Sequence, residues 1–242
     1  MKPRAFCVGQ AKSGTASLYG LVAGRYAAAH EPEREQLLDT ILRESEGSMS
    51  PAEVASFLRA RQDRLELDFD IAWANQFVVE HLVDVFPSAR FIALFRDPPS
   101  WLGSMVGHLL SREIPPDVRA FLDWWFKPEE HPFGEGDEGL VERGLYSTRA
   151  FLSVWRRHVR RCVEAIPVER LLIVRTHELH SSHGVIADFL GIPWGALDQD
   201  RGHLNRGTWE ASLDTVLDPT YVHDQIMLQC GDEMRRYFPE FS

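Results

Sequence analysis

The sequence predicts a three-layer α/β protein with a central, mostly parallel sheet flanked by helices. Three short apolar runs are rich in β-branched or aromatic residues, as buried parallel strands are: residues 6–8, 91–95 and 171–174. Helical patterns separate these runs, so strands and helices alternate along the chain. A glycine-containing turn leads from the first run directly into a helix. We expect one domain over residues 1–242, because this length suffices for a single large α/β core.

The first half of the chain adds a strand and two helices to this plan. Residues 50–53, Ser-Pro-Ala-Glu, have the form of a capping box with proline at the first helical position. Residues 67–71 form a candidate fourth strand. Residues 73–86 are amphipathic and are followed by Pro87, which predicts a helix that ends there.

The second half predicts two further helices and an irregular segment. A long helix is expected over residues 145–165, ended by Pro167, and another helix after Asp218-Pro219. Residues 127–144 are rich in glycine, proline and acidic side chains, which predicts a mobile surface loop and a candidate lid.

Composition limits the classes of function. The chain is 44% apolar and 26% charged, as is typical of a soluble globular protein, and no stretch approaches the roughly 20 apolar residues of a membrane span. The first strand follows the N-terminus without an apolar leader, which predicts a cytoplasmic location. The formal charge of -10 argues against general affinity for nucleic acid, so an anionic ligand would need a local cluster of positive groups. Three widely separated cysteines, Cys7, Cys162 and Cys230, predict buried free thiols.

Residues 8–15, with the sequence V-G-Q-A-K-S-G-T, predict an anion-binding turn like a P-loop. Glycines allow the backbone to approach a phosphate closely, and the first N–H groups of the following helix point at it. Lys12 adds a full positive charge. Because this lysine precedes the second glycine, the segment differs from the ATP and GTP motif G-x-x-x-x-G-K-[ST]. The alternative is a solvated surface lysine in an ordinary turn.

A second candidate anion site follows the strand at residues 91–95. Arg96 closes this strand, and ligands of open parallel sheets bind beyond the carboxyl ends of strands. Ser104 and His108 share a face of the next helix. The alternatives are an ion pair between Arg96 and Asp97, a solvent-facing Ser104 and a packed histidine.

Together, G-x-x-K-S-G-T and R-D-P with a serine eight residues after the arginine resemble the bacterial and Golgi-like branch of the sulfotransferases that use 3′-phosphoadenosine 5′-phosphosulfate (PAPS). Residues 86–92 and 190–193 also look like that family. The resemblance implies that a loop surrounds the 5′-phosphosulfate, formed by Lys12, Ser13, Gly14, Thr15, Ala16 and Ser17. It implies that Arg96 and Ser104 bind the 3′-phosphate, and that Arg206 and Gly207 belong to a late basic loop that reaches the same phosphate. Ala11 and Ala16 depart from the commonest loop, and Ala16 cannot make a hydroxyl contact.

The expected reaction moves a sulfuryl group by in-line displacement from PAPS to a hydroxyl or amine of a small-molecule, lipid-like or glycan acceptor. Lys12 would neutralise charge on the leaving phosphate oxygen. The acceptor requires a general base, and the resemblance implies Glu31, with His30 in reserve. The alternative is that Glu31 merely charges the first turn of a helix over residues 32–43. No sequence pattern has metal-ligand spacing, so no metal is expected.

The acceptor pocket is less defined. Trp124, Trp125 and Phe126 are consecutive and cannot all face one core, so they form either a substrate wall or core packing with one ring at the surface. The acidic residues of 127–144 disfavour a highly sulfated polysaccharide as acceptor.

Two other classes of function are open. A P-loop kinase or nucleotide hydrolase would use Ser13 for magnesium and an acidic residue at the end of a second strand, but that strand ends at Arg96. A non-catalytic nucleotide-binding or scaffold protein would retain the fold without the base.

Overall fold

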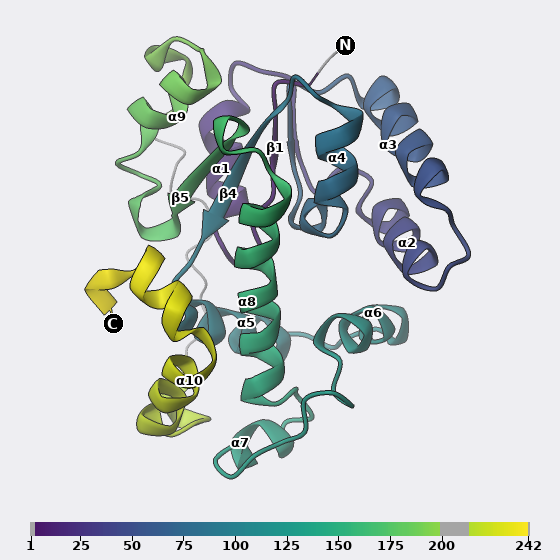
Figure 1. Ribbon diagram of the computed structural model, residues 1–242. Coiled ribbons are helices and arrows are strands. Elements are labelled where there is room, and N and C mark those ends of the chain that lie inside the picture. The colour runs from purple at the N-terminus through teal and green to yellow at the C-terminus, as the bar shows by residue number, and fades with distance from the viewer. Residues whose placement is uncertain (1–2, 199–212, 242) are drawn as a thin grey trace. The chain divides into compact units, whose positions relative to one another are not determined.

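The computed structural model describes residues 3–198 and 213–241 and has an α/β fold, which confirms the predicted class (Figure 1). It divides into two compact units. The first contains the described residues of 1–95 and 161–206, and the second those of 96–160 and 207–242.

The first unit is built on a parallel sheet with strand order β2-β3-β1-β4-β5. The strands are β1 (Ala5–Cys7), β2 (Ala28–His30), β3 (Phe69–Ile71), β4 (Arg90–Phe95) and β5 (Leu171–Arg175). Ile71 pairs in register with both Cys7 and His30, and Cys7 also pairs with Ile92. The carboxyl ends of β1, β2 and β3 therefore lie at one edge. The sequence predicted every strand except β2.

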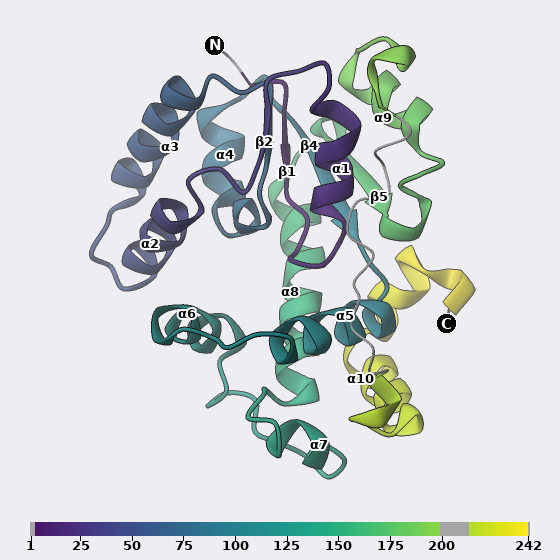
Figure 2. The ribbon, with the colours of Figure 1, turned by 180° about the vertical axis from the view of Figure 1, so that it is seen from behind.

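Helices cover both faces of this sheet. On one face, α1 (Thr15–Val22) and α9 (His183–Leu190) share a buried cluster with Cys7 and Ile92, and α1 lies in front of the strands in Figure 2. Phe6 and Phe91, next to these residues in the chain, point to the opposite face, where Figure 1 shows α4 (Val79–Val85). The Phe6 ring lies 5.8 Å from that of Phe91. This alternation follows from the period of two in a strand.

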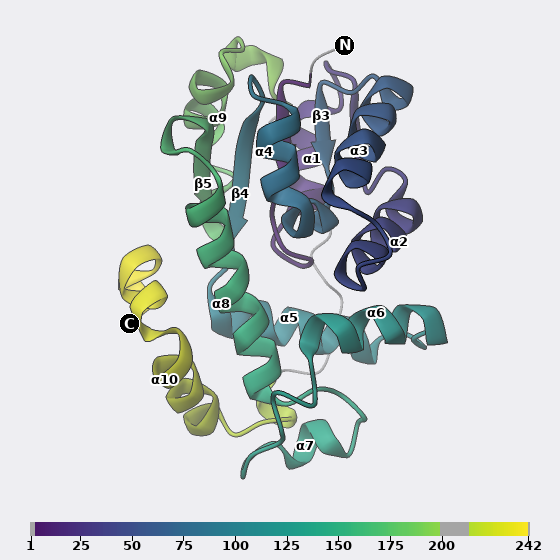
Figure 3. The ribbon, with the colours of Figure 1, turned by 45° about the vertical axis from the view of Figure 1, so that its right-hand side comes forward.

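Two further helices, α2 (Arg34–Ser45) and α3 (Pro51–Leu65), follow β2 in the chain, and Figure 3 shows α3 beside α4. The predicted capping box at the start of α3 is confirmed, because Ser50 N donates to Glu53 Oε2 at 2.8 Å and Glu53 N donates back to Ser50 Oγ.

The segment predicted as one helix over residues 73–86 begins instead as a 3₁₀ helix, η1 (Trp73–Val78), and continues as α4. The buried Asn75 side chain bonds there to Cys7 O and to Asp70. The tighter turn coincides with these tertiary hydrogen bonds, which an amphipathic pattern does not encode.

The second unit is helical. It contains α5 (Pro98–Leu110), α6 (Pro116–Phe126), α7 (Glu138–Val141), α10 (Pro219–Tyr237) and most of α8 (Thr148–Ala165), whose last residues belong to the first unit. Shorter 3₁₀ turns complete the two units: η2 (Val168–Arg170), η3 (Thr176–Glu178), η4 (Trp194–Ala196), η6 (Leu213–Thr215) and η7 (Pro239–Phe241). The helices expected before Pro167 and after Asp218 are α8 and α10.

Residues 127–144 contain α7 and are hydrogen-bonded to the start of α8. The buried Asp137 carboxylate accepts from Thr148 Oγ1 at 2.6 Å and from Gly134 N at 3.0 Å. The lid role of this segment stays a prediction. The three cysteines are buried free thiols, as expected. Among the described residues, no helix combines the length and apolarity required to cross a membrane.

Candidate functional site

The loop between β1 and α1 approaches its neighbours closely. A Cβ atom at Gly9 would lie 2.7 Å from Ser13 Oγ and 2.9 Å from Leu94 Cβ, so only glycine fits. Gly14 has φ 99° and is the N-cap of α1. Lys12 adopts φ 69°, a left-handed conformation that is uncommon for a residue with a side chain. Such conformations concentrate at functional sites.

The N-terminus of α1 has the features of an anion site. Helix geometry leaves its first N–H groups without intrahelical acceptors, and Gly14, as the N-cap residue, has no side chain that could accept from them. The half-buried Lys12 precedes these groups by two residues. Aligned amides and a nearby ammonium are the combination that phosphate groups bind in proteins.

Ser13 shapes this loop from within. Its backbone N–H and its hydroxyl both donate to Gln10 O, at 3.1 and 2.6 Å, and the side chain is buried. Thr176 Oγ1 donates to Ser13 O at 2.7 Å. Sequence reasoning did not select Thr176, although its position directly after β5, at the carboxyl edge of the sheet, was the available signal.

Glu31 lies at the same edge, one residue after β2. Its Oε1 accepts from Trp73 N at 3.1 Å, whereas Oε2 is buried and has no hydrogen-bond partner among the described residues. Its side chain is 17% exposed. Burial therefore raises the pKa of Glu31 to about 7, against the smaller lowering effect of the Trp73 N–H. A carboxyl with this pKa can both accept and release a proton near neutrality.

His30 links Glu31 to the start of α1. Its Nε2 lies 3.0 Å from Thr15 Oγ1 and 3.6 Å from Glu31 Oε1. Burial lowers the pKa of His30. The structure thus brings together Thr15, His30 and Glu31. The alternative role for Glu31, in the first turn of a helix over 32–43, loses its basis because α2 begins only at Arg34.

Arg96 and Ser104 belong to the second unit. Trp155 Nε1 donates to Arg96 O at 2.8 Å, and burial lowers the pKa of the Arg96 guanidinium. Asp97 acts as the N-cap of α5 by accepting from Ser100 N at 2.9 Å. Ser104 is half-buried on α5. Arg206 and Gly207, the remaining predicted ligands, lie outside the described residues.

The three consecutive aromatic residues of α6 mostly pack inside the second unit. Phe126 stacks on Tyr146 at 4.4 Å, Trp125 is 4% exposed, and Trp124 is half-buried with its ring 5.2 Å from Phe121. Core packing with one ring partly exposed describes them. In the described ranges, no group of three or more His, Cys, Asp or Glu side chains has the geometry to hold a metal ion.

A parallel sheet whose first strand leads through a glycine-containing turn into a helix defines a class of α/β proteins, and ligands of such sheets bind beyond the carboxyl ends of the strands. A model of the sulfotransferase domain matches residues 4–200, and the chain belongs to this sulfotransferase family.

Solved structures share the fold. A sulfotransferase from Alicyclobacillus acidocaldarius is 18% identical with a TM-score of 0.56, covering 98% of this chain and 94% of its own. A sulfotransferase from Mycobacterium avium is 15% identical with a TM-score of 0.55, covering 98% of this chain and 77% of its own. No curated protein matches the chain. Family and fold indicate an enzyme that transfers sulfuryl groups.

Proposed function

We propose that the protein transfers a sulfuryl group from PAPS to a hydroxyl or amine of a small-molecule, lipid-like or glycan acceptor. The observation that carries the proposal is that a glycine-capped helix N-terminus and a buried carboxyl of raised pKa lie at one edge of the sheet. Thr15, the first residue of α1, is joined to Glu31 through His30. In-line transfer needs both a site for the leaving phosphate and a base for the acceptor.

The described residues fit a phosphate-bearing donor. The absence of a Cβ at Gly9 and the left-handed Gly14 let the backbone close around an anion, and α1 presents its N-terminus there. Bound PAPS would supply the phosphosulfate anhydride whose S–O bond is broken.

Each residue then has a defined task. The N–H groups of Gly14, Thr15 and Ala16 would bind the 5′-phosphate, and the Lys12 ammonium would neutralise negative charge that develops on it. Ser13 holds the loop in shape through Gln10 O, and Ser17 flanks the helix start. In the second unit, Arg96 and Ser104 are the proposed ligands of the 3′-phosphate, on the strength of the family resemblance.

Glu31 is the proposed general base. Its carboxylate would take the proton of the acceptor hydroxyl as that oxygen attacks sulfur. His30, which contacts both Thr15 and Glu31, would hold the two side chains in position relative to one another. The base form exists above the pKa, so turnover should rise with pH through about 7 as Glu31 loses its proton.

The test is transfer of labelled sulfate from PAPS to a panel of alcohols, phenols, amines and sugars, with wild type and Glu31→Gln. We expect the variant to lose on the order of a hundredfold or more in kcat, since general-base catalysis contributes about 10²–10⁴-fold. Calorimetry should give an unchanged affinity for adenosine 3′,5′-bisphosphate. A variant with full turnover would move the base elsewhere, and a wild type that transfers no sulfate and binds no bisphosphate would refute the proposal.

The kinase or hydrolase alternative requires an acidic residue at the end of a second strand to hold magnesium, whereas β4 ends at Phe95 and is followed by Arg96. Turnover that persists in the presence of a chelator would separate the two. The scaffold alternative predicts that Lys12→Ala leaves the cellular role intact.

A further inference from the structure

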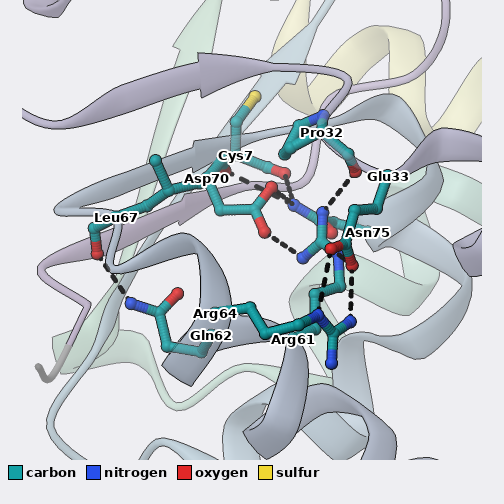
Figure 4. A network of polar contacts seen from close by, with 9 residues as sticks. All are labelled: Cys7, Pro32, Glu33, Arg61, Gln62, Arg64, Leu67, Asp70 and Asn75. Carbon is teal, nitrogen blue, oxygen red and sulfur yellow. Dashed lines mark hydrogen bonds and ion pairs between the residues drawn. The ribbon is translucent and has the colours of Figure 1, made fainter.

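A buried ion pair adjoins the segment that carries Glu31 (Figure 4). Arg61 of α3 and Asp70 of β3 are 2% and 0% exposed, and Arg61 Nη1 donates to Asp70 Oδ2. Asn75 Nδ2 donates to the other carboxylate oxygen at 3.1 Å. Burying two charges is costly unless further hydrogen bonds satisfy them. The other hydrogen bonds of this pair are therefore expected to stabilise the fold.

Arg61 also forms a hydrogen bond with the backbone next to Glu31. Its Nη2 donates to Pro32 O at 2.7 Å, and its Nε lies 3.9 Å from Glu33 Oε2. Arg64, one turn along the same helix, holds the Glu33 carboxylate at 2.8 Å from the exposed side. Figure 4 shows both arginines reaching from α3 to this segment.

The segment needs such support because its backbone is strained. Glu31 has φ 57° and Glu33 has φ 46°, on either side of Pro32. Residues with side chains persist in this region only where the surroundings over-determine it. The bond from Arg61 to Pro32 O fixes the carbonyl group between the two strained residues.

The same network reaches the strand that leads into the phosphate loop. Asn75 Nδ2 also lies 3.2 Å from Cys7 O, at the end of β1, and Asp70 pairs in register with Phe6 and Ala29. One buried cluster therefore contacts the ends of β1 and β3 and the turn after β2.

We propose that Arg61 is a positioning residue that, by binding Pro32 O and Asp70 together, holds the Glu31 carboxyl in its place at the sheet edge. Arg61 is buried and touches no reacting atom; it acts through Glu31. The inference rests on the proposed function, in which Glu31 is the base.

In the part of the chain that the structure describes, the charged groups near Glu31 are Arg34 of α2, Arg61 of α3 and Asp70 of β3, and the titratable His30 of β2 lies beside it. Arg61→Lys keeps the positive charge and loses only the forked geometry. If the turn relaxes, Glu31 gains water, and its pKa should fall from about 7 toward the ordinary carboxyl range.

The experiment compares Arg61→Lys with Arg59→Lys, a matched control at an exposed arginine of the same helix. Carboxyl ¹³C NMR of the ligand-free protein, assigned with Glu31→Gln, follows the pKa of Glu31. We expect Arg61→Lys to lower that pKa and to reduce kcat at least tenfold with an unchanged KM for PAPS, since a displacement of about 1 Å can cost a hundredfold. Arg59→Lys should change neither.

A second, double variant tests the proposal in case Arg61→Lys does not fold. Arg61→Met with Asp70→Asn removes both buried charges together, so no unpaired charge remains. Either folded variant that retains both the native Glu31 titration and native turnover overturns the proposal. Unfolding of both variants overturns it too, because Arg61 would then be a requirement of the fold. Full activity of Glu31→Gln would show that Glu31 is not the general base. This result differs from the two outcomes that would overturn the role of Arg61, because it is seen with Arg61 intact.

Discussion

At the residue scale, two proposed catalytic residues have left-handed backbones. Lys12 and Glu31 are among five non-glycine residues with positive φ in the described ranges: Lys12, Glu31, Glu33, Glu66 and Lys127. Such a conformation costs of order 1–3 kcal/mol, and function is one reason for its retention. A lysine or a glutamate in the sequence does not predict a left-handed backbone. The positive φ of Lys12 and Glu31 therefore supports their proposed roles independently of the sequence motif.

Replacing Lys12 by alanine should reduce turnover on the order of a hundredfold. Loss of one preorganised donor to a developing oxyanion costs about 3 kcal/mol. Steady-state sulfate transfer measures it. Lys127→Ala is the matched control, because Lys127 is also left-handed at φ 50° but lies in the second unit with its ammonium 2.8 Å from Glu130. Equal losses in both variants would contradict the assignment.

The raised pKa of Glu31 also predicts how stability depends on pH. Its pKa is raised in the folded protein, so between the ordinary carboxyl range and about 7 the folded state binds more protons than the unfolded state. Stability should therefore fall as pH rises through this window. Glu31→Gln cannot ionise and should be more stable than wild type at pH 8, on the order of 2 kcal/mol, with the difference vanishing toward pH 4.

Urea denaturation across this pH range measures the effect. Glu35→Gln, at an exposed carboxyl of α2, should show no such pH-dependent gain. Parallel stability curves for wild type and Glu31→Gln would show that Glu31 titrates normally.

At the element scale, local patterns predicted what local chemistry determines. Apolar runs identified β1, β3, β4 and β5, and Ser50 and Glu53 marked the start of α3. β2 was not predicted because Ala28, Ala29 and His30 have no β-branched side chain; it is a strand because it pairs with β3. The Arg61 to Asp70 ion pair was equally invisible, since it depends on how α3 packs.

The loop between β1 and α1 also shows what the sequence could and could not predict. The motif predicted both glycines, but the structure shows that each position requires glycine for a different reason. Gly14 has a positive φ, whereas a side chain at Gly9 would clash with Ser13 and Leu94. The placement of Glu31 near Thr15 required the sheet, because pairing of β2 with β3 brings His30 to the start of α1.

Gly9→Ala should destabilise the protein by about 1–3 kcal/mol, the usual cost of overpacking, because the new methyl group would meet Ser13 Oγ and Leu94. Since Ser13 must then move, bisphosphate binding should weaken as well. Thermal denaturation and calorimetry measure the two effects. Gly195→Ala is the control, since a Cβ there meets nothing within 4 Å. Native stability of Gly9→Ala would show that the loop is not closely packed.

At the scale of the whole molecule, net charge and local charge have opposite signs. The chain carries 36 acidic and 26 basic residues, so its overall field opposes a polyanionic donor. Affinity must come from local positive groups. The proposed ones are Lys12, in the loop after β1, and Arg96, directly after β4.

The proposed roles of Lys12 and Arg96 predict which phosphate each substitution affects. Arg96→Met should weaken binding of adenosine 3′,5′-bisphosphate about 30-fold, because a hydrogen bond to a charged group is worth about 1.5–3 kcal/mol. Binding of adenosine 5′-phosphate, which lacks the 3′-phosphate, should be unchanged, whereas Lys12→Ala should weaken both nucleotides. Arg149→Met, at an exposed arginine of α8, is the control. If calorimetry shows that Arg96→Met weakens both nucleotides equally, Arg96 does not recognise the 3′-phosphate; if it weakens neither, the 3′-phosphate is bound by other residues.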